Sequence, residues 1–183
     1  MATARIWTIG HSNRALEDFV AILKAHCVER VLDVRRFPAS RKWPHFNAAS
    51  LARTLPAVGI DYIGLPELGG RRKADPHSPH TAWRLEAFRG YADFMDTPEF
   101  DQPFEKAMEA AREKPSALMC AESLPWRCHR SLLADAFLTH GWEVFEILSE
   151  KEARPHKLPD FARLEGTRII YDVLTTRPLD LRP

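Results

Sequence analysis

The sequence has little of what would tie it to a membrane, a disulfide scaffold or a nucleic-acid duplex. Its longest apolar runs fall far short of the roughly 20 residues that a transmembrane helix needs, so we expect no membrane span. It has three cysteines, Cys27, Cys120 and Cys128, an odd number that does not form a disulfide framework. Lysine and arginine total 26 against 25 aspartates and glutamates, so no global charge draws the chain to nucleic acid.

Targeting signals, internal repeats and low-complexity segments are also missing. Residues 1–5 lead straight into a strand-like run, so we expect no secretory signal. Together with the few cysteines, this predicts a reducing cytoplasm as the location. A chain of 183 residues with 45% hydrophobic residues predicts one domain over residues 1–183 with a substantial core.

What is present is an alternation of short apolar runs with helical patterns. The runs predict strands over residues 6–10, 31–35, 61–65, 116–121 and 143–148. Apolar residues at helical spacing between them predict helices. The alternation predicts an α/β fold with a mostly parallel five-stranded sheet, helices on both faces and a Rossmann-like architecture. A β-prone run from Thr167 to Val173 adds a short C-terminal tail.

Polar clusters directly follow four of these strands. They begin at His11, Arg35, Arg71 and Arg127. Because ligands bind beyond the carboxyl ends of parallel strands, we expect the four clusters to meet at one edge of the sheet. Several guanidinium groups there favour phosphate or carboxylate oxygens, which they match in pairs. The sequence therefore predicts an anion-binding cleft.

The loop after the fourth strand is the richest in chemistry. It carries Cys120 and Glu122 and leads to Cys128, near the expected start of a helix. The positive end of that helix and the neighbouring Arg127 and Arg130 predict a lowered pKa for the Cys128 thiol. Cys120 is a second candidate catalytic thiol, although at the end of a buried strand it fits a core position equally well.

These residues favour an enzyme with a cysteine nucleophile. We expect Cys128 to attack and His11 to act as base, since His129 adjoins Cys128 and neighbours on a helix do not face each other. Glu122 or Asp33 would orient the imidazole, although Asp33 fits a buried ion pair equally well. The spacing from Cys120 to Arg127 resembles the phosphate loops of cysteine phosphatases and rhodaneses, but it is longer and lacks their glycines.

A phosphorylated, nucleotide-like or nucleic-acid substrate suits the side chains around the expected cleft. Tryptophans in the same loops offer flat rings on which a base can stack. The predicted binding residues are Ser12, Arg35, Arg41, Trp43, Arg71, Trp126, Arg127, His129 and Arg130.

Two alternatives remain open. One is a non-catalytic module that binds a nucleotide or single-stranded nucleic acid in the same cleft. The other is a zinc- or iron-dependent hydrolase, because thiols and imidazoles are ligands for these metals. No closely spaced cysteine pair is present and the arginines disfavour a divalent cation, so no cofactor is predicted.

Five separated motifs in order resemble the family catalogued as domain of unknown function 488. They are TIGHSN (8–13), DVRRFPASRKWPHFN (33–47), LGGRR (68–72), FRGYADFM (88–95) and LMCAESLPWRCHRSLLA (118–134). The similarity runs on to a tail motif around His156 and residues 168–171. The resemblance implies a small bacterial or archaeal α/β domain but no substrate. Its motif residues match here at His11, Ser12, Asp33, Arg35, Arg41, Cys120, Glu122, Cys128, His129 and Arg130.

Overall fold

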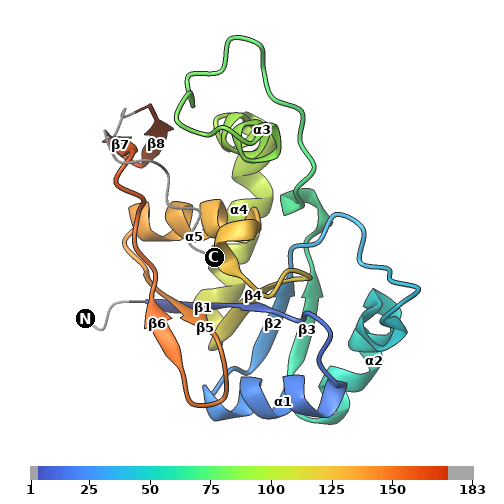
Figure 1. Cartoon of the computed structure of the whole chain (residues 1–183). Helices are drawn as coiled ribbons and strands as arrows, with labels where there is room; N and C mark the ends of the chain where they lie inside the picture. The colour runs from blue at the N-terminus through green and yellow to red at the C-terminus, as the bar shows by residue number, and fades with distance from the viewer. Residues whose placement is uncertain (1–3, 173–183) are drawn as a thin grey trace.

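The protein is a mixed α/β structure built around a six-stranded sheet, seen in a computed structural model that describes residues 4–172 (Figure 1). The strand order is β3-β2-β4-β1-β5-β6, and all neighbours are parallel except β5 and β6. The strands are β1 Arg5–Gly10, β2 Arg30–Asp33, β3 Asp61–Gly64, β4 Ser116–Cys120, β5 Glu143–Ile147 and β6 Ala153–Pro155.

Within residues 4–172 five α-helices accompany the sheet. They are α1 Leu16–Ala25, α2 Ala48–Ala57, α3 Glu86–Met95, α4 Pro98–Glu113 and α5 Arg130–Thr139. Three short 3-10 turns lie in the loops at η1 Pro44–Phe46, η2 Pro66–Leu68 and η3 Pro125–Arg127. In Figure 1, α1 lies below the strands and α2 to the right of β3, whereas α5 lies above β1.

Two buried clusters follow the alternation of side chains along the central strands. Leu32 and Leu118 pack with residues of α3, α4 and α5. Their neighbours Val31 and Ala117 pack with residues of α1 and α2. Successive strand residues point to opposite faces, and β2 and β4 are buried throughout.

The predicted α/β class and mostly parallel sheet are confirmed, with one more strand than expected. β6 pairs antiparallel with β5 and carries Arg154 and Pro155, so it lacks an apolar run that would have indicated it. Proline is tolerated at such an edge. The strand order differs from the 3-2-1-4-5-6 order of dinucleotide-binding folds, and the Rossmann-like description stays a prediction.

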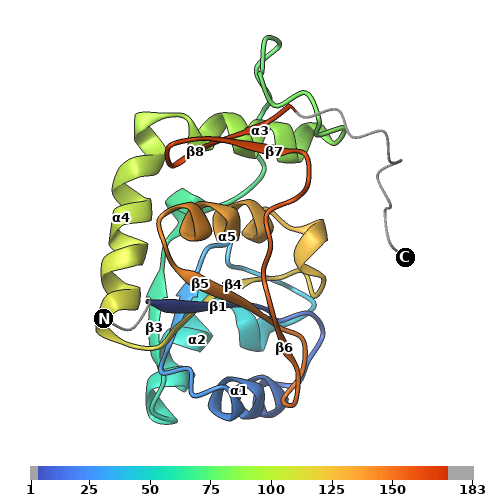
Figure 2. The same cartoon turned by 90° about the vertical axis from the view of Figure 1, so that its left-hand side faces the viewer.

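The C-terminal β-prone tail forms a separate hairpin of β7 Ala162–Glu165 and β8 Arg168–Tyr171. Figure 2 shows this hairpin running beside α3, on the same side of the sheet as α5. Val173, the last residue of the predicted tail, lies outside the described residues, as do residues 1–3 and 174–183 of the predicted domain. Within the described part of the chain, the helices are too short or too polar to cross a bilayer.

Candidate active site

The loop after β4 is held tightly against the end of β1. The backbone amides of His11 and Ser12 donate hydrogen bonds of 2.9 Å to the carbonyls of Cys120 and Ala121. A Cβ at Gly10 would lie only 1.8 Å from the carbonyl oxygen of Glu122, so this approach needs glycine. The loop therefore presents Cys120 at the carboxyl edge of the sheet.

Arg130 holds the same loop from beneath. Its guanidinium is buried and donates hydrogen bonds to the carbonyl oxygens of Glu122 at 3.0 Å and Ser123 at 3.5 Å. Arg130 does not line the cleft described below. Its position indicates that Arg130 supports the loop. The sequence had predicted that it binds the substrate.

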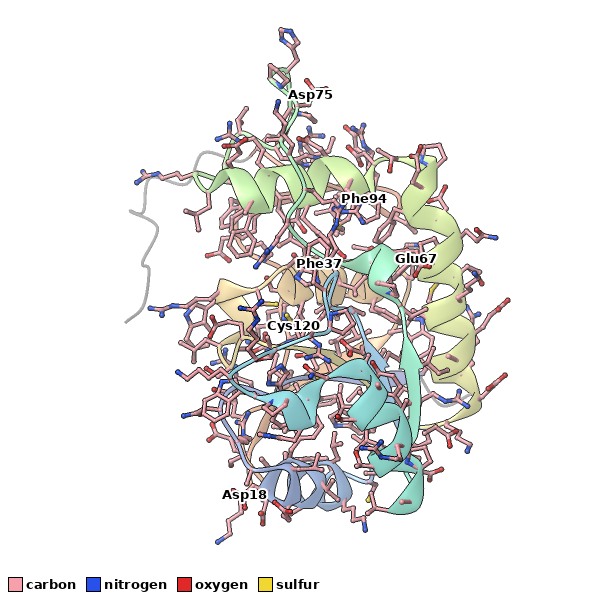
Figure 3. The ribbon with its side chains drawn as sticks, turned by 90° about the vertical axis from the view of Figure 1, so that its right-hand side faces the viewer. Asp18, Phe37, Glu67, Asp75, Phe94 and Cys120 are labelled. Carbon is pink, nitrogen blue, oxygen red and sulfur yellow. The ribbon has the colours of Figure 1, made fainter. Side chains whose placement is uncertain are left out.

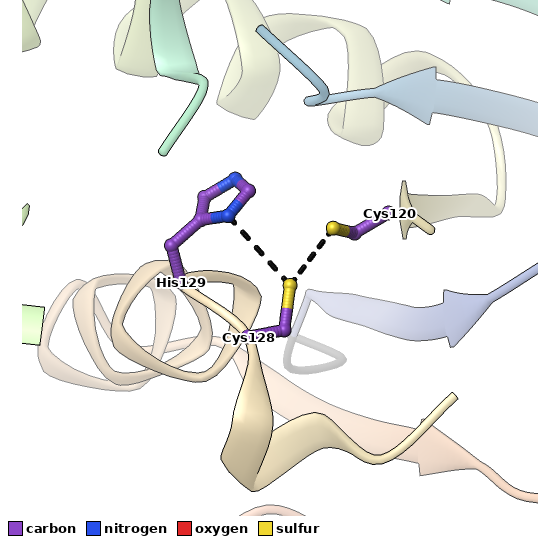
Figure 4. A group of neighbouring side chains, drawn as sticks. All are labelled: Cys120, Cys128 and His129. Atoms are coloured by element: carbon purple, nitrogen blue, oxygen red, sulfur yellow. Dashed lines mark hydrogen bonds between the residues drawn. The ribbon is translucent and has the colours of Figure 1, made fainter. Parts of the chain in front are cut away.

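Cys120, Cys128 and His129 form a compact cluster (Figure 4). The Cys128 thiol donates to the Cys120 sulfur at 2.8 Å, and Nδ1 of His129 lies 3.6 Å from the Cys128 sulfur. Nε2 of His129 lies 3.0 Å from the carbonyl oxygen of Val34, an acceptor only, so Nε2 carries the proton and Nδ1 is free to accept one. The three groups form a chain that can pass a proton.

The hydrogen bond between the two thiols shifts their pKa values in opposite directions. The hydrogen bond from Cys128 lowers the pKa of Cys120 well below that of an ordinary thiol, outweighing burial, and His129 adds to the effect. The same hydrogen bond, together with burial, raises the pKa of Cys128 well above it. The lowered pKa expected for Cys128 is therefore wrong. α5 begins only at Arg130, and Cys128 acts as the hydrogen-bond donor.

His129 lies close to Cys128 in the structure, although sequence analysis expected these neighbours to face apart. That expectation required both residues to lie within a helix, but Cys128 has extended backbone angles, φ −134° and ψ 142°. His129 is the N-cap of α5. Their side chains can therefore converge although the residues are adjacent.

His11 has no free nitrogen. Its Nδ1 lies 2.8 Å from the carbonyl oxygen of Ser12, and its Nε2 accepts a hydrogen bond of 3.1 Å from Arg35. Burial, together with the Arg35 charge, lowers the pKa of His11 to about 4, so the ring is neutral at physiological pH. This arrangement does not suit the general base expected from the sequence.

Asp33 lies beneath the cleft and fixes Arg35. Its carboxylate accepts hydrogen bonds from Nε of Arg35 at 2.8 Å and from a terminal nitrogen at 2.5 Å, and the Tyr62 hydroxyl donates at 2.7 Å. Only 1% of Asp33 is exposed. Of the two roles considered for Asp33, the geometry corresponds to the ion pair.

Residues from all four polar clusters line one cleft of about 740 Å³. Most of the predicted site residues are among them: His11, Ser12, Arg35, Trp43, Arg71, Cys120, Glu122, Arg127, Cys128 and His129. A smaller cavity of about 200 Å³ also reaches Cys120 and His129. Cys128 does not line this smaller cavity, so Cys120 is the sulfur accessible from both.

The rim of the cleft combines cations with aromatic rings, and some of these residues escaped the sequence analysis. Phe37 is 64% exposed, and the Arg71 guanidinium lies 5.7 Å from its ring (Figure 3 shows Phe37 close to Cys120). The Lys42 amine lies 5.2 Å from the Trp43 ring. The stretch RRFP could have indicated that Phe37 is exposed. An aromatic residue between arginine and proline directly after a strand does not easily pack into the core.

Two residues of the cleft adopt a left-handed backbone without being glycine, Ser12 at φ 52° and Arg71 at φ 60°. Such conformations cost free energy and cluster at functional sites. The strain marks the two loops that carry Ser12 and Arg71 into the cleft.

The structure leaves Arg41 and Trp126 outside the cleft. Arg41 is exposed. Trp126 turns to a second cavity of about 640 Å³, where the Arg154 guanidinium lies 5.2 Å from its ring.

The second cavity borders a buried ionic network. His156 bonds Asp135 at 2.7 Å and Glu146 at 2.8 Å, and the Tyr171 hydroxyl donates to Asp135 at 2.7 Å. Burial acts to lower the pKa of His156, but the hydrogen bonds to both carboxylates outweigh it and raise the pKa to about 9. Each polar group is already paired, so the network fastens β5 and β8 to α5.

One comparison with known proteins bears on this site. A family model described as "Domain of unknown function DUF488" matches residues 15–137, which include both cysteines of the cluster, His129 and Arg35. No curated protein and no solved structure shows significant similarity to the chain.

Proposed function

The chain belongs to the DUF488 family, whose description names no activity, and from its cleft we propose an enzyme that attacks a phosphorylated or nucleotide-like substrate with a cysteine thiolate. The observation that carries this proposal is the Cys120–Cys128–His129 cluster opening into a cleft with basic side chains. A reducing compartment such as the cytoplasm would keep both thiols available.

Cys120 is the nucleophile in this proposal. Its lowered pKa supports a thiolate at neutral pH, and the thiolate is the reactive form of cysteine. Cys128 and His129 would supply or withdraw a proton as the bond to Cys120 forms and breaks. Arg127, Arg71 and Lys42 would hold the anionic group.

The rings at the rim support a flat group on the substrate. Phe37 is too exposed to serve the core, and Trp43 lines the same cleft. An aromatic ring beside guanidinium groups is suited to a base carrying a phosphate. We therefore favour a nucleotide, or the end of a single strand, over a simple phosphate ester.

Alkylation by iodoacetamide at pH 7 tests the nucleophile. We expect Cys120 to react at least about tenfold faster than free cysteine. Cys120→Ser removes the fast reaction, whereas Cys27→Ser, at an exposed thiol that lines neither cavity, leaves it unchanged. A Cys120 rate equal to that of free cysteine refutes the nucleophile.

Protection from alkylation tests the substrate class. A nucleoside monophosphate should protect Cys120 at lower concentration than inorganic phosphate does, and Phe37→Leu should remove that difference. Equal protection by both ligands in the unmodified protein argues against a site for a base.

A specific observation favours a metal-dependent hydrolase as the second candidate. The two sulfurs and Nδ1 of His129 lie within 4.8 Å of one another, and the Nε2 proton directed at the Val34 carbonyl is typical of metal-binding histidines. Such a site would have one position open to the cleft for water. Stoichiometric zinc or iron after purification, lost in Cys128→Ser, would favour it, and metal-bound thiolates would resist alkylation.

A further inference from the structure

We propose that Cys120 and Cys128 form a reactive dithiol that exchanges with small anionic disulfides and closes into an intramolecular disulfide. This inference rests on the reactivity proposed for Cys120, but it needs neither a phosphorylated substrate nor a nucleotide. It adds a second activity to the site and a way to switch off the first.

Proximity is the first argument. The sulfurs are 2.8 Å apart and need to approach by less than about 1 Å to reach a disulfide bond length of about 2.05 Å. Cys120 ends β4, whereas Cys128 lies in the extended segment before α5, so closure involves the loop between them and not the sheet.

The two sulfurs are also suited to different steps of the exchange. A low-pKa thiol attacks a disulfide readily, and a second thiol beside it resolves the product. Cys120 lines both cavities and accepts the hydrogen bond from the Cys128 thiol. Cys128 keeps its proton and has Nδ1 of His129 at 3.6 Å to receive it.

The charge of the cleft determines which disulfide fits. Lys42, Arg71 and Arg127 line it, and Glu122 is the acidic residue among its lining side chains. A disulfide that carries carboxylates is therefore attracted, whereas one that carries amines is repelled. Glutathione disulfide and cystamine provide a matched pair of probes with opposite charge.

The exchange balances in two steps. The Cys120 thiolate attacks one sulfur of glutathione disulfide, which forms a mixed disulfide and releases one glutathione thiolate. The Cys128 thiol then gives its proton to Nδ1 of His129, and its sulfur attacks the Cys120 sulfur. The second glutathione thiolate leaves, so two protein thiols are oxidised as one glutathione disulfide is reduced.

The test treats the reduced full chain with glutathione disulfide at pH 7, quenches with iodoacetamide and measures the intact mass. We expect Cys120 and Cys128 to escape alkylation, so that the product carries one carbamidomethyl group, on Cys27, and is otherwise two hydrogen atoms lighter than the reduced chain. Cys128→Ser should stop at a glutathione adduct on Cys120, and Cys120→Ser should react at least about tenfold more slowly. Cys27→Ser should behave as the unmodified protein, and cystamine should react at least about threefold more slowly than glutathione disulfide at low salt.

Any other result overturns the inference. The iodoacetamide rate of Cys120 then shows whether the proposed function fails with it. A stable glutathione adduct on Cys120 in the unmodified protein means that Cys128 does not resolve it. No reaction with glutathione disulfide refutes the exchange, and fast iodoacetamide labelling of Cys120 in the same sample would leave the proposed function standing. Slow labelling as well would refute both. Equal rates with the two probes would refute selection by charge.

Discussion

At the scale of single residues, the site depends on positions that do no chemistry. Arg130 donates hydrogen bonds to loop carbonyls. Asp33 accepts hydrogen bonds from Arg35, and Arg35 donates one to the ring of His11. Asp33 and Arg35 are buried as an ion pair, and His11 is hydrogen-bonded to Arg35, whereas the buried guanidinium of Arg130 bonds only backbone carbonyls. Substitution of these residues is expected to disturb the position of the sulfurs and not only the charge of the cleft.

Gly70 is the residue on which the position of His129 depends most directly. A Cβ at residue 70 would lie 2.8 Å from Nδ1 of His129. Gly70→Ala should displace the ring from Cys128 and slow alkylation of Cys120 by roughly tenfold or more, since misplacements near 1 Å are costly. The rate constant with iodoacetamide at pH 7 measures this.

Gly64→Ala is the matched control, because the nearest atom to its Cβ would be the Tyr62 hydroxyl at 3.9 Å. It should leave the rate unchanged. An unchanged rate in Gly70→Ala, with the fold intact by circular dichroism, would mean that His129 contributes nothing to the reactivity of Cys120.

At the scale of elements, the His156 network ties the C-terminal hairpin to the sheet. The folded protein raises the pKa of His156 from 6.5 to about 9, so this stabilisation is complete below pH 6.5 and is lost as the pH rises through about 9. The shift corresponds to about 3 kcal/mol at most. The free energy of unfolding should therefore fall between pH 6.5 and 9.5.

Urea denaturation across this pH range checks the expectation. His156→Gln should be less stable at pH 6.5 and should show a weaker dependence on pH, because the group that titrates is gone. His26→Gln is a control at a histidine whose ring bonds the Ser149 carbonyl and no carboxylate. Parallel curves for the unmodified protein and His156→Gln would contradict the assignment.

Sequence reasoning recovered the elements whose cause is local. The apolar runs of β2 and β4 and the spacing in α1 and α5 indicate strand and helix by composition alone. β6 was not predicted, because it is a strand through its pairing with β5 and not through the composition of its own residues. The parallel order also explained why His11, Arg71 and Arg127 meet.

Side-chain geometry was beyond the sequence. Which sulfur gives its proton to the other depends on distances across a loop, and the engagement of His11 depends on Arg35 lying beside it. The direction of Trp126 away from the cleft depends on Arg154, from a strand that composition does not indicate. These contacts form between distant parts of the chain.

At the scale of the whole molecule, the charge is nearly balanced while the cleft is basic. The formal net charge is +1, yet Lys42, Arg71 and Arg127 line one cavity. A small anion bound there should lose affinity gently with salt, since each phosphate contact on a single strand contributes a slope of roughly −0.7 in log affinity against log salt. We expect a slope no steeper than about −2 for a nucleoside monophosphate.

Titration at several salt concentrations measures this slope and separates the two kinds of function. An oligonucleotide that binds far more tightly than the monophosphate, with a slope steeper than about −3, would favour the non-catalytic nucleic-acid module. Arg127→Gln should flatten the slope for the monophosphate.

The position of β5 sets a limit on how the chain can be shortened. The family match covers residues 15–137, so it includes neither β1, which leads into the cleft loop of His11, nor β5, which pairs with β1 over residues 5–8. A fragment trimmed to residues 15–137 would lack β1 and β5 and would leave the β1-facing edge of β4 with unpaired amides and carbonyls, which favours aggregation. It would also leave the buried carboxylate of Asp135 without its partner, the imidazolium of His156. The shortest fragment expected to keep the fold and the cleft is therefore longer than the segment that matches the family model.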